Sequence, residues 1–196
     1  MSKYDKLVIV ESNAKAKIIK NYLNSIEELK KLGNFNVIAS FGHIRDLQKK
    51  NKGIDIDNDF KPIYETALND EFKVKVLKQL KDSIKKSKVI WLAADCDREG
   101  EAIAWHIKDY FKIKNYKRIT FNEITKDALK YAVLHKRKID MNLVKAQEAR
   151  RFIDRIVGFD ISPILWKTFN TSTVLSAGRV QSATLNIIIN RENEIN

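Results

Sequence analysis

The chain has 196 residues, of which 44% are hydrophobic and 32% charged, and its formal net charge is +12. This length suits one or two domains with a core that needs no disulfide bonds. The positive charge favours a polyanionic partner, nucleic acid first and an anionic membrane second, although a lysine-rich composition can also exist without such a partner. Cys96 is the single cysteine, so neither a disulfide framework nor a zinc cluster is expected.

The N-terminus and the apolar runs give no sign of a targeting or membrane segment. Residues 1–6 lack the apolar core of a signal peptide. No stretch of the sequence approaches the roughly 20 apolar residues that a membrane-spanning helix needs. We therefore expect an intracellular protein that does not reside in a membrane.

Predicted strands and helices alternate at the start of the chain. Residues 7–10 form a continuous apolar run, which is typical of a buried strand. Ser12 can then cap a helix over residues 14–23. Residues 35–41 are a second predicted strand. Residues 42–64 are rich in turn-forming side chains and are expected to form an ordered loop.

The alternation continues as far as residue 121. A lysine-rich amphipathic helix is predicted over residues 69–86, and a buried strand over residues 89–94. A helix over residues 99–111 and a strand over residues 118–121 follow. Alternating strands and helices predict an α/β fold, with a mostly parallel, Rossmann-like sheet and helices on both of its faces.

From residue 125 the pattern becomes helical, with no further strand signal. Thr125 can cap a helix to about residue 136, and Asp140 can cap a longer helix to about residue 159. Pro163 is expected to open a short helix, and a last helix is predicted over residues 179–196.

This change of pattern predicts a domain boundary. We place an α/β domain at residues 1–124, and the start of an all-helical domain at residues 125–196. The last predicted helix reaches Asn196 without a C-cap, so we expect the second domain to be incomplete in this chain.

Three acidic residues, Asp95, Asp97 and Glu99, follow directly after the predicted strand over residues 89–94. Residues two apart in extended backbone point the same way, so these carboxylates could converge. Converging carboxylates repel one another unless a cation neutralises them, and Mg²⁺ suits such a site because it prefers oxygen ligands. The alternative is a solvated acidic helix start, in which Glu99 and Glu101 complement the helix dipole.

Glu11 ends the first predicted strand, and Lys15 follows about one helical turn later. If the two strands are neighbours, Glu11 lies beside Asp95, at the strand ends where open α/β sheets bind ligands. A carboxylate next to a metal, with Lys15 and Arg98 at hand, suits phosphoryl transfer. The alternative is a surface glutamate that pairs with Lys15.

A second candidate surface lies on the predicted helix that Asp140 caps. Arg151 and Arg155 are four residues apart, so their charges repel unless an anion lies between them. The phosphate backbone of DNA would be such an anion. The alternative is pairing within the helix, of Arg150 with Asp154 and of Glu148 with Arg151.

The acidic segments resemble the Toprim domain, an acidic Mg²⁺-binding fold shared by topoisomerases, bacterial primases and some nucleases. Its two signatures match Glu11 and the DxDxE motif that begins at Asp95. Further segments resemble bacterial-type topoisomerase I, of the type IA topoisomerase family: FGHIRDL, RITFNEITKDAL, AQEARRFIDRIVGFDISPILWK and LSAGRVQSATLNIIINRENEI. The matching segments cover nearly the whole chain in order. Asn13 stands where the family usually has proline.

The resemblance implies relaxation of negatively supercoiled DNA by transient single-strand cleavage and religation through a 5′-phosphotyrosine. It implies that Mg²⁺ is held by Glu11, Asp95, Asp97 and Glu99. Glu11 would also handle the 3′ hydroxyl group, while Lys15 and Arg98 stabilise the charge of the scissile phosphate. The residues that would line a groove for single-stranded DNA are His43, Arg150, Arg151, Asp154, Arg155, Ser176, Gly178, Arg179 and Gln181. For His43 the alternative is a partly buried structural histidine.

The resemblance also implies a nucleophilic tyrosine in a separate domain, well downstream of the LSAGRVQS segment, and all six tyrosines of this chain precede that segment. We therefore expect the chain alone not to cleave DNA, and further C-terminal topoisomerase domains to act with it in cis or in trans. Its location would be DNA-associated. Two other functions stay open: a non-catalytic Toprim module that binds nucleic acid, and a Toprim nuclease that uses water as its nucleophile.

Overall fold

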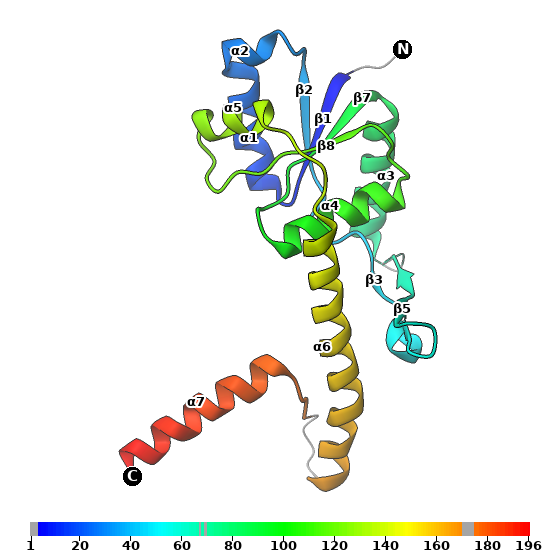
Figure 1. Cartoon of the computed structure of the whole chain (residues 1–196), viewed down its shortest axis with the longest axis vertical. Coiled ribbons are helices and arrows are strands. Elements are labelled where there is room, and N and C mark those ends of the chain that lie inside the picture. The colour runs from blue at the N-terminus through cyan, green and yellow to red at the C-terminus, as the bar shows by residue number, and fades with distance from the viewer. Residues whose placement is uncertain (1–3, 67, 69, 170–174) are drawn as a thin grey trace. The chain divides into compact units, whose positions relative to one another are not determined.

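The computed structural model describes residues 4–66, 68, 70–169 and 175–196 (Figure 1). The chain forms two compact units. The first, here the sheet unit, comprises Met1–Asp46 and Tyr64–Gln147. The second, here the helical unit, comprises Leu47–Ile63 and Glu148–Asn196.

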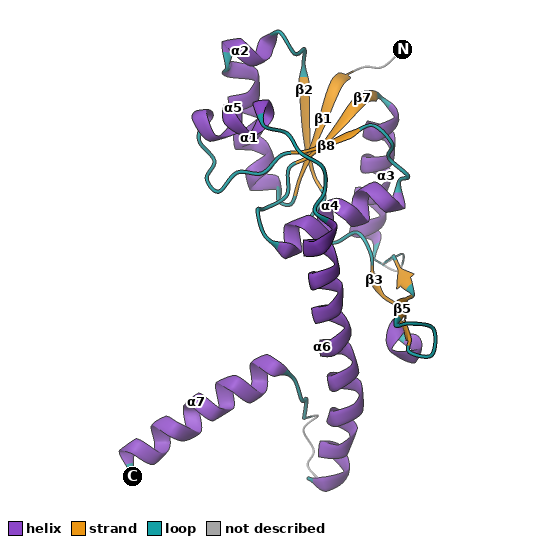
Figure 2. Cartoon of the chain, viewed as in Figure 1, coloured by secondary structure: helices purple, strands orange, loops and turns teal. Residues whose placement is uncertain are grey.

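A four-stranded sheet is the centre of the sheet unit. Its strands lie in the order β2-β1-β7-β8, and every neighbouring pair is parallel (Figure 2). In the central strand, Ile9 lies opposite Ile38 on one side and Leu92 on the other. The strands are β1 (Tyr4–Val10), β2 (Phe35–Ala39), β7 (Ser87–Leu92) and β8 (Tyr116–Arg118).

Helices cover both faces of this sheet, as the alternating pattern predicted (Figure 2). Val8 and Val10 of β1 pack into a core with α1 and α5 on one face. Leu7 and Ile9 pack into a second core with α3 and α4 on the other face. Because both faces are covered, the inner strands β1 and β7 each contain a continuous apolar run. The α/β fold class is confirmed. The helices are α1 (Asn13–Ser25), α2 (Glu27–Lys30), α3 (Glu71–Lys85), α4 (Arg98–Tyr110) and α5 (Lys126–Leu134).

The predicted N-caps are present. Ser12 Oγ accepts a hydrogen bond from the N–H of Lys15 at 3.3 Å, and Thr125 Oγ1 accepts one from Ala128 N–H at 3.2 Å. Asp140 accepts hydrogen bonds from the first backbone amides of α6 (Met141–Thr168), which satisfies donors that a helix start leaves unpaired. The helix predicted from residue 69 begins at Glu71, and residue 69 itself lies outside the described residues.

The segment predicted as an ordered loop, residues 42–64, contains several short elements. Strands β4 and β5 pair antiparallel, with Ile54 opposite Pro62. Gly53 has a φ of 68°, and a Cβ at that position would lie 2.6 Å from the backbone nitrogen of Gln48, so only glycine fits this turn. The elements are β3 (Asp46–Leu47), η1 (Lys50–Gly53), β4 (Ile54–Asp55), β5 (Lys61–Pro62) and β6 (Tyr64–Glu65), which ends just after the predicted loop.

The last two helices are α6 and α7 (Arg179–Ile195). Pro163 lies inside α6, so the prediction that it opens a separate short helix was wrong. The φ that the proline ring fixes is compatible with a helix, and here the loss of one backbone donor does not end it. Among the described helices, none is long and apolar enough to cross a membrane.

The two compact units do not coincide with the two predicted domains. Helix α5 and the first turns of α6 belong to the sheet unit, whereas Leu47–Ile63 belong to the helical unit. The domain boundary at residue 125 stays a prediction, because compact units need not coincide with domains that follow one another along the chain.

Candidate metal centre and nucleic-acid interface

Glu11 and Asp95 meet at the carboxyl edge of the sheet. They follow β1 and β7, whose pairing continues past Ile9 through a 2.8 Å hydrogen bond from Ala93 N–H to the Ile9 carbonyl oxygen. The N–H of Asp95 donates to Glu11 Oε1 at 2.7 Å. The structure therefore brings together two residues that are far apart in the chain, as expected if their strands were neighbours.

Lys15 also lies at this edge. It is in the first turn of α1, and its ammonium group forms an ion pair with Asp95 Oδ1. The sequence suggested Glu11 as an alternative partner for Lys15. The observed partner is the aspartate, so Lys15 supplies positive charge to the acidic cluster itself.

The other two carboxylates of the DxDxE motif are engaged differently. Asp97 caps α4 by accepting a 2.8 Å hydrogen bond from the N–H of Gly100. Glu99 Oε2 lies 3.3 Å from His43 Nε2 and accepts a 3.1 Å hydrogen bond from Gln147 Nε2. Within the described part of the chain, no three Asp, Glu, His or Cys side chains are gathered as ligands of one metal ion. Arg98 is exposed at the first position of α4.

A buried arginine fixes the loop that carries Asp95. Arg118 is fully buried, and its guanidinium donates to the carbonyl oxygens of Ala94 at 2.7 Å and Asp95 at 2.6 Å. Its Nε donates to Glu101 at 3.0 Å. Sequence reasoning missed this residue because an arginine in a short strand gives no sign of being buried.

Glu101 joins that loop to the start of α6. It is fully buried and accepts hydrogen bonds from Arg118, from Arg137 at 2.8 and 2.9 Å, and from the N–H of Asp140 at 2.6 Å. Burial alone raises the pKa of Glu101, but hydrogen bonds from Arg137 and Asp140 and the charges of both arginines outweigh it and lower the pKa. Glu101 is therefore a buried anion with four donors, and not the solvated helix-start residue that the sequence suggested.

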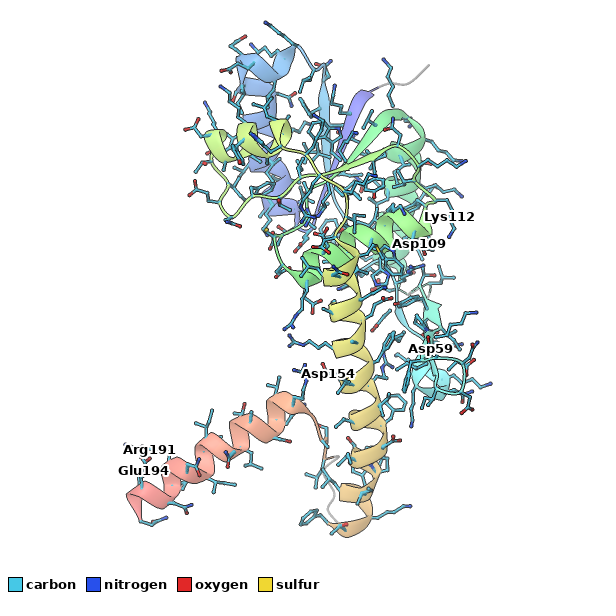
Figure 3. The ribbon with its side chains drawn as sticks, viewed as in Figure 1. Asp59, Asp109, Lys112, Asp154, Arg191 and Glu194 are labelled. Atoms are coloured by element: carbon cyan, nitrogen blue, oxygen red, sulfur yellow. The ribbon has the colours of Figure 1, made fainter. Side chains whose placement is uncertain are left out.

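A second cluster, around the buried His106, lies next to His43. Arg45 Nε donates to His106 Nδ1 at 2.8 Å, and its Nη2 donates to Asp109 at 2.7 Å (Figure 3 labels Asp109). Burial, with the nearby charge of Arg45, lowers the pKa of His106 to about 3. His106 is therefore a neutral structural histidine, whose ring lies 5.5 Å from that of His43.

The helical unit holds most of the residues expected to line a DNA groove. Arg179, at the start of α7, forms a two-bond ion pair with Asp154 of α6, one bond being 2.7 Å from Nη2 to Oδ2 (Figure 3 labels Asp154). Arg150 lies 4.0 Å from the same carboxylate. The Arg179 hydrogen bond is the main cause that lowers the pKa of Asp154. The pairing of Arg150 with Asp154, proposed as the alternative to DNA contact, is thus present in part.

The remaining candidates are spread over the same unit. Arg155 donates to the Leu47 carbonyl oxygen at 3.4 Å and lies over the Phe159 ring. Gly178 is the N-cap of α7, and a Cβ there would contact the flexible amide of Gln181. The exposed residues among the candidates are Arg151, Ser176, Arg179 and Gln181.

Comparison with known proteins gives matches to two parts of the chain, one that contains the acidic residues and one that contains α6 and α7. A family model described as the Toprim domain matches residues 6–124, and one described as DNA topoisomerase matches residues 138–196. The chain belongs to the Toprim family. The two matches together support an N-terminal part of a type IA topoisomerase. It is also similar to the solved full-length topoisomerase I from Thermotoga maritima, with 47% identity and a TM-score of 0.78. That match covers 96% of this chain and 30% of the other, so the chain spans about a third of the length of its relative.

Toprim domains generally bind Mg²⁺, and the carboxylates of this Toprim domain fit such an ion in type. Glu11, Asp95, Asp97 and Glu99 offer the oxygen ligands that Mg²⁺ prefers, at the open edge of a parallel sheet. Lys15 already brings one positive charge to Asp95. In this structure the carboxylates have other partners, so an ion would compete with the N–H of Gly100 and with the side chains of Lys15, His43 and Gln147.

Proposed function

We propose that this chain supplies the acidic centre and part of the single-strand groove of an enzyme that relaxes negatively supercoiled DNA. Such an enzyme breaks one strand, keeps a 5′-phosphotyrosine and reseals the break. The covalent linkage conserves the energy of the phosphodiester bond, so no ATP is required. The observation that carries the proposal is the contact of Glu11 with Asp95, which joins the two Toprim signatures at one sheet edge beside Lys15.

Asp95, Asp97, Glu99 and Glu11 are the proposed holders of Mg²⁺. When bound, the ion would neutralise phosphate charge and align the ends of the broken strand. The backbone of the Asp95 loop is held by Arg118, so Asp95 starts from a fixed base and not from a loose turn. A rigid support of this kind reduces the ordering that must occur on binding.

Glu11 is the proposed acid and base at the 3′ hydroxyl group. Its Oε1 is oriented by the Asp95 N–H at 2.7 Å, and the side chain is only partly buried, so a nucleotide can reach it. Lys15 and the exposed Arg98 are proposed to stabilise the negative charge that develops on the scissile phosphate.

The residues proposed to contact DNA belong to both units, His43 to the sheet unit and the others to the helical unit. Arginine side chains that pair with Asp154 can exchange that carboxylate for a phosphate, which is the same kind of bidentate partner. The proposed groove residues are His43, Arg150, Arg151, Asp154, Arg155, Ser176, Gly178, Arg179 and Gln181. Their neutralisation of phosphates makes affinity fall as salt rises.

The nucleophilic tyrosine is assigned to further C-terminal topoisomerase domains, in cis or in trans. All six tyrosines here precede the LSAGRVQS segment, whereas the resemblance implies a nucleophile well downstream of it. The assembled enzyme would act inside the cell, on its DNA.

A chimera tests the proposal. It joins this chain to the portion of the Thermotoga maritima enzyme that lies beyond the match. With Mg²⁺ it should relax negatively supercoiled plasmid, and Glu11→Gln should slow relaxation by about 100-fold or more, as expected for loss of an acid and base. Glu27→Gln is the matched control, because Glu27 is an exposed glutamate in α2 that pairs with nearby Lys30.

Two outcomes would replace the proposal. Nicked plasmid with free ends, produced by the chain alone, would show a nuclease that uses water. Mg²⁺-sensitive binding of single-stranded DNA without relaxation by a folded chimera would show a binding module without catalysis.

A further inference from the structure

Two aromatic rings stand exposed at the edge of the acidic centre. Phe41 and Phe72 contact each other edge to face, with ring centroids 5.0 Å apart and an interplanar angle of 79°. Phe41 is 37% exposed and Phe72 is 51% exposed. Neither ring belongs to the two cores of the sheet unit, so burial within this unit does not explain the pair.

The backbone holds Phe41 in an unfavourable conformation. Its φ is 56°, in the left-handed region that bulky side chains rarely adopt, and Gly42 follows with a φ of 82°. Such conformations persist where the surrounding structure imposes them, and they concentrate at functional sites. Here the turn directly follows β2 and leaves the Phe41 ring in contact with solvent.

Hydrogen bonds tie this turn to the acidic centre. The N–H of Gly42 donates to the Glu11 carbonyl oxygen at 3.3 Å, so the residue after Phe41 contacts Glu11 directly. On the other side of the turn, His43 contacts Glu99. The aromatic pair thus lies next to the place where the proposed scissile phosphate would bind.

Lys73 adds a positive charge at the same point. Its ammonium group donates to the carbonyl oxygens of Phe41 at 2.9 Å and His43 at 3.2 Å. An ammonium group has three donors, so one is left for a phosphate oxygen. A cation beside two exposed rings matches the chemistry of a nucleotide, which carries an aromatic base and an anionic phosphate.

We propose that Phe41 and Phe72 form a stacking platform for one base of single-stranded DNA, with Lys73 contacting the phosphate of that nucleotide. Every base has an aromatic face, so the platform would hold the strand beside the acidic centre without reading its sequence. This inference rests on the proposed function, because it concerns the same DNA strand.

Binding of two short oligonucleotides to the full chain tests the platform. One is an oligothymidine of about 12 nucleotides, and the other has the same backbone without bases. Fluorescence anisotropy gives both affinities at one salt concentration. Phe41→Ala and Phe72→Ala should each weaken oligothymidine binding about tenfold, which is within the range for loss of one stacked base, and should leave binding of the abasic strand unchanged.

Tyr131→Ala is the matched control. Tyr131 is an exposed aromatic residue that stacks on the ring of His135. It belongs to α5, which covers the opposite face of the sheet from α3, the helix that carries Phe72. It should change neither affinity. Phe72→Trp should keep oligothymidine binding and Phe72→Leu should not, because only the former retains an aromatic face.

Three results would contradict the platform, and they differ in whether the proposed function fails with it. If the unmodified chain binds neither oligonucleotide, the proposed function is overturned, and the platform with it. If it binds both and the alanine variants match Tyr131→Ala, the platform alone is wrong, and the rings instead serve to pack against protein. Equal weakening for both oligonucleotides would also overturn stacking, because a base that is absent cannot be lost.

Discussion

Helices α4 and α7 each begin with an arginine that is a candidate site residue, Arg98 and Arg179. The two helices are fixed to the protein in different ways. Helix α4 buries most of one side, including the charged Glu101, in the sheet unit. Helix α7 buries none of its residues, and its Arg179 is held by a surface ion pair with Asp154. A buried network fixes position, whereas a surface pair is readily exchanged for another anion. The acidic centre is thus built to be rigid, and the basic surface to change partners.

The largest effect should come from breaking the buried network. Arg118→Met removes one partner of the ion pair with Glu101, and leaves that buried carboxylate with less compensation. We expect the free energy of unfolding to fall by about 3–5 kcal/mol, measured by urea denaturation. Asp154→Asn breaks the exposed pair with Arg179 and should cause little change. Similar losses for the two variants would contradict the contrast between the units.

The pH dependence of stability should reveal the lowered pKa of the buried His106. The pKa of His106 falls from 6.5 to about 3 on folding, so below pH 6.5 the unfolded chain binds a proton that the folded chain excludes. Stability should therefore be highest above pH 6.5, and should fall by up to about 1.4 kcal/mol per pH unit as the pH drops towards 3. Urea denaturation at a series of pH values measures this slope.

His106→Asn should flatten the slope. Asparagine keeps an acceptor for Arg45 but cannot be protonated in this range. His135→Asn, at an exposed site on the C-cap of α5, serves as the control and should leave the slope as it is. An unchanged slope in His106→Asn would mean that the acid sensitivity has another origin, such as Glu101.

Alanine substitutions at two helical glycines, Gly100 and Gly158, should change stability by smaller amounts and in opposite directions. A Cβ on Gly100 of α4 would lie 2.7 Å from the backbone nitrogen of Asp95, whereas one on Gly158 of α6 would have its nearest neighbour, the Ala177 carbonyl oxygen, at 3.8 Å. Gly100→Ala should destabilise the fold by about 1–3 kcal/mol through overpacking. Gly158→Ala should stabilise it by about 0.5–1 kcal/mol, because alanine favours a helix. Thermal unfolding measures both changes in stability. If Gly100→Ala does not lower stability, the loop that carries Asp95 can shift to make room for the added Cβ.

The sequence predicted those parts of the fold that depend on local pattern. Apolar runs predicted β1, β2 and β7, whereas β8 shares only Arg118 with the strand expected over residues 118–121. Ser12, Thr125 and Asp140 predicted the helix starts, because a cap bonds to amides only two or three residues away. The meeting of Glu11 and Asp95 was also predictable, since parallel strands in one sheet place their carboxyl ends at the same edge.

What could not be predicted depends on contacts between distant residues. The burial of Arg118 follows from the carbonyl oxygens of a neighbouring loop, which no local pattern encodes. The engagement of Glu99 with His43 and Gln147 is likewise set by packing. Pro163 misled the prediction because proline is common at the first position of a helix, but only context decides whether a new helix begins there.

The alternation along β1 has a consequence for how this protein can evolve. Odd-numbered Leu7 and Ile9 fill one core and even-numbered Val8 and Val10 fill the other, so Glu11 continues the odd-numbered series. Inserting or deleting one residue in this strand would exchange the two layers and turn the carboxylate to the opposite side of the sheet. Such a change would remove the fold and the chemistry together, so β1 can vary in the identity of its side chains but not in their number.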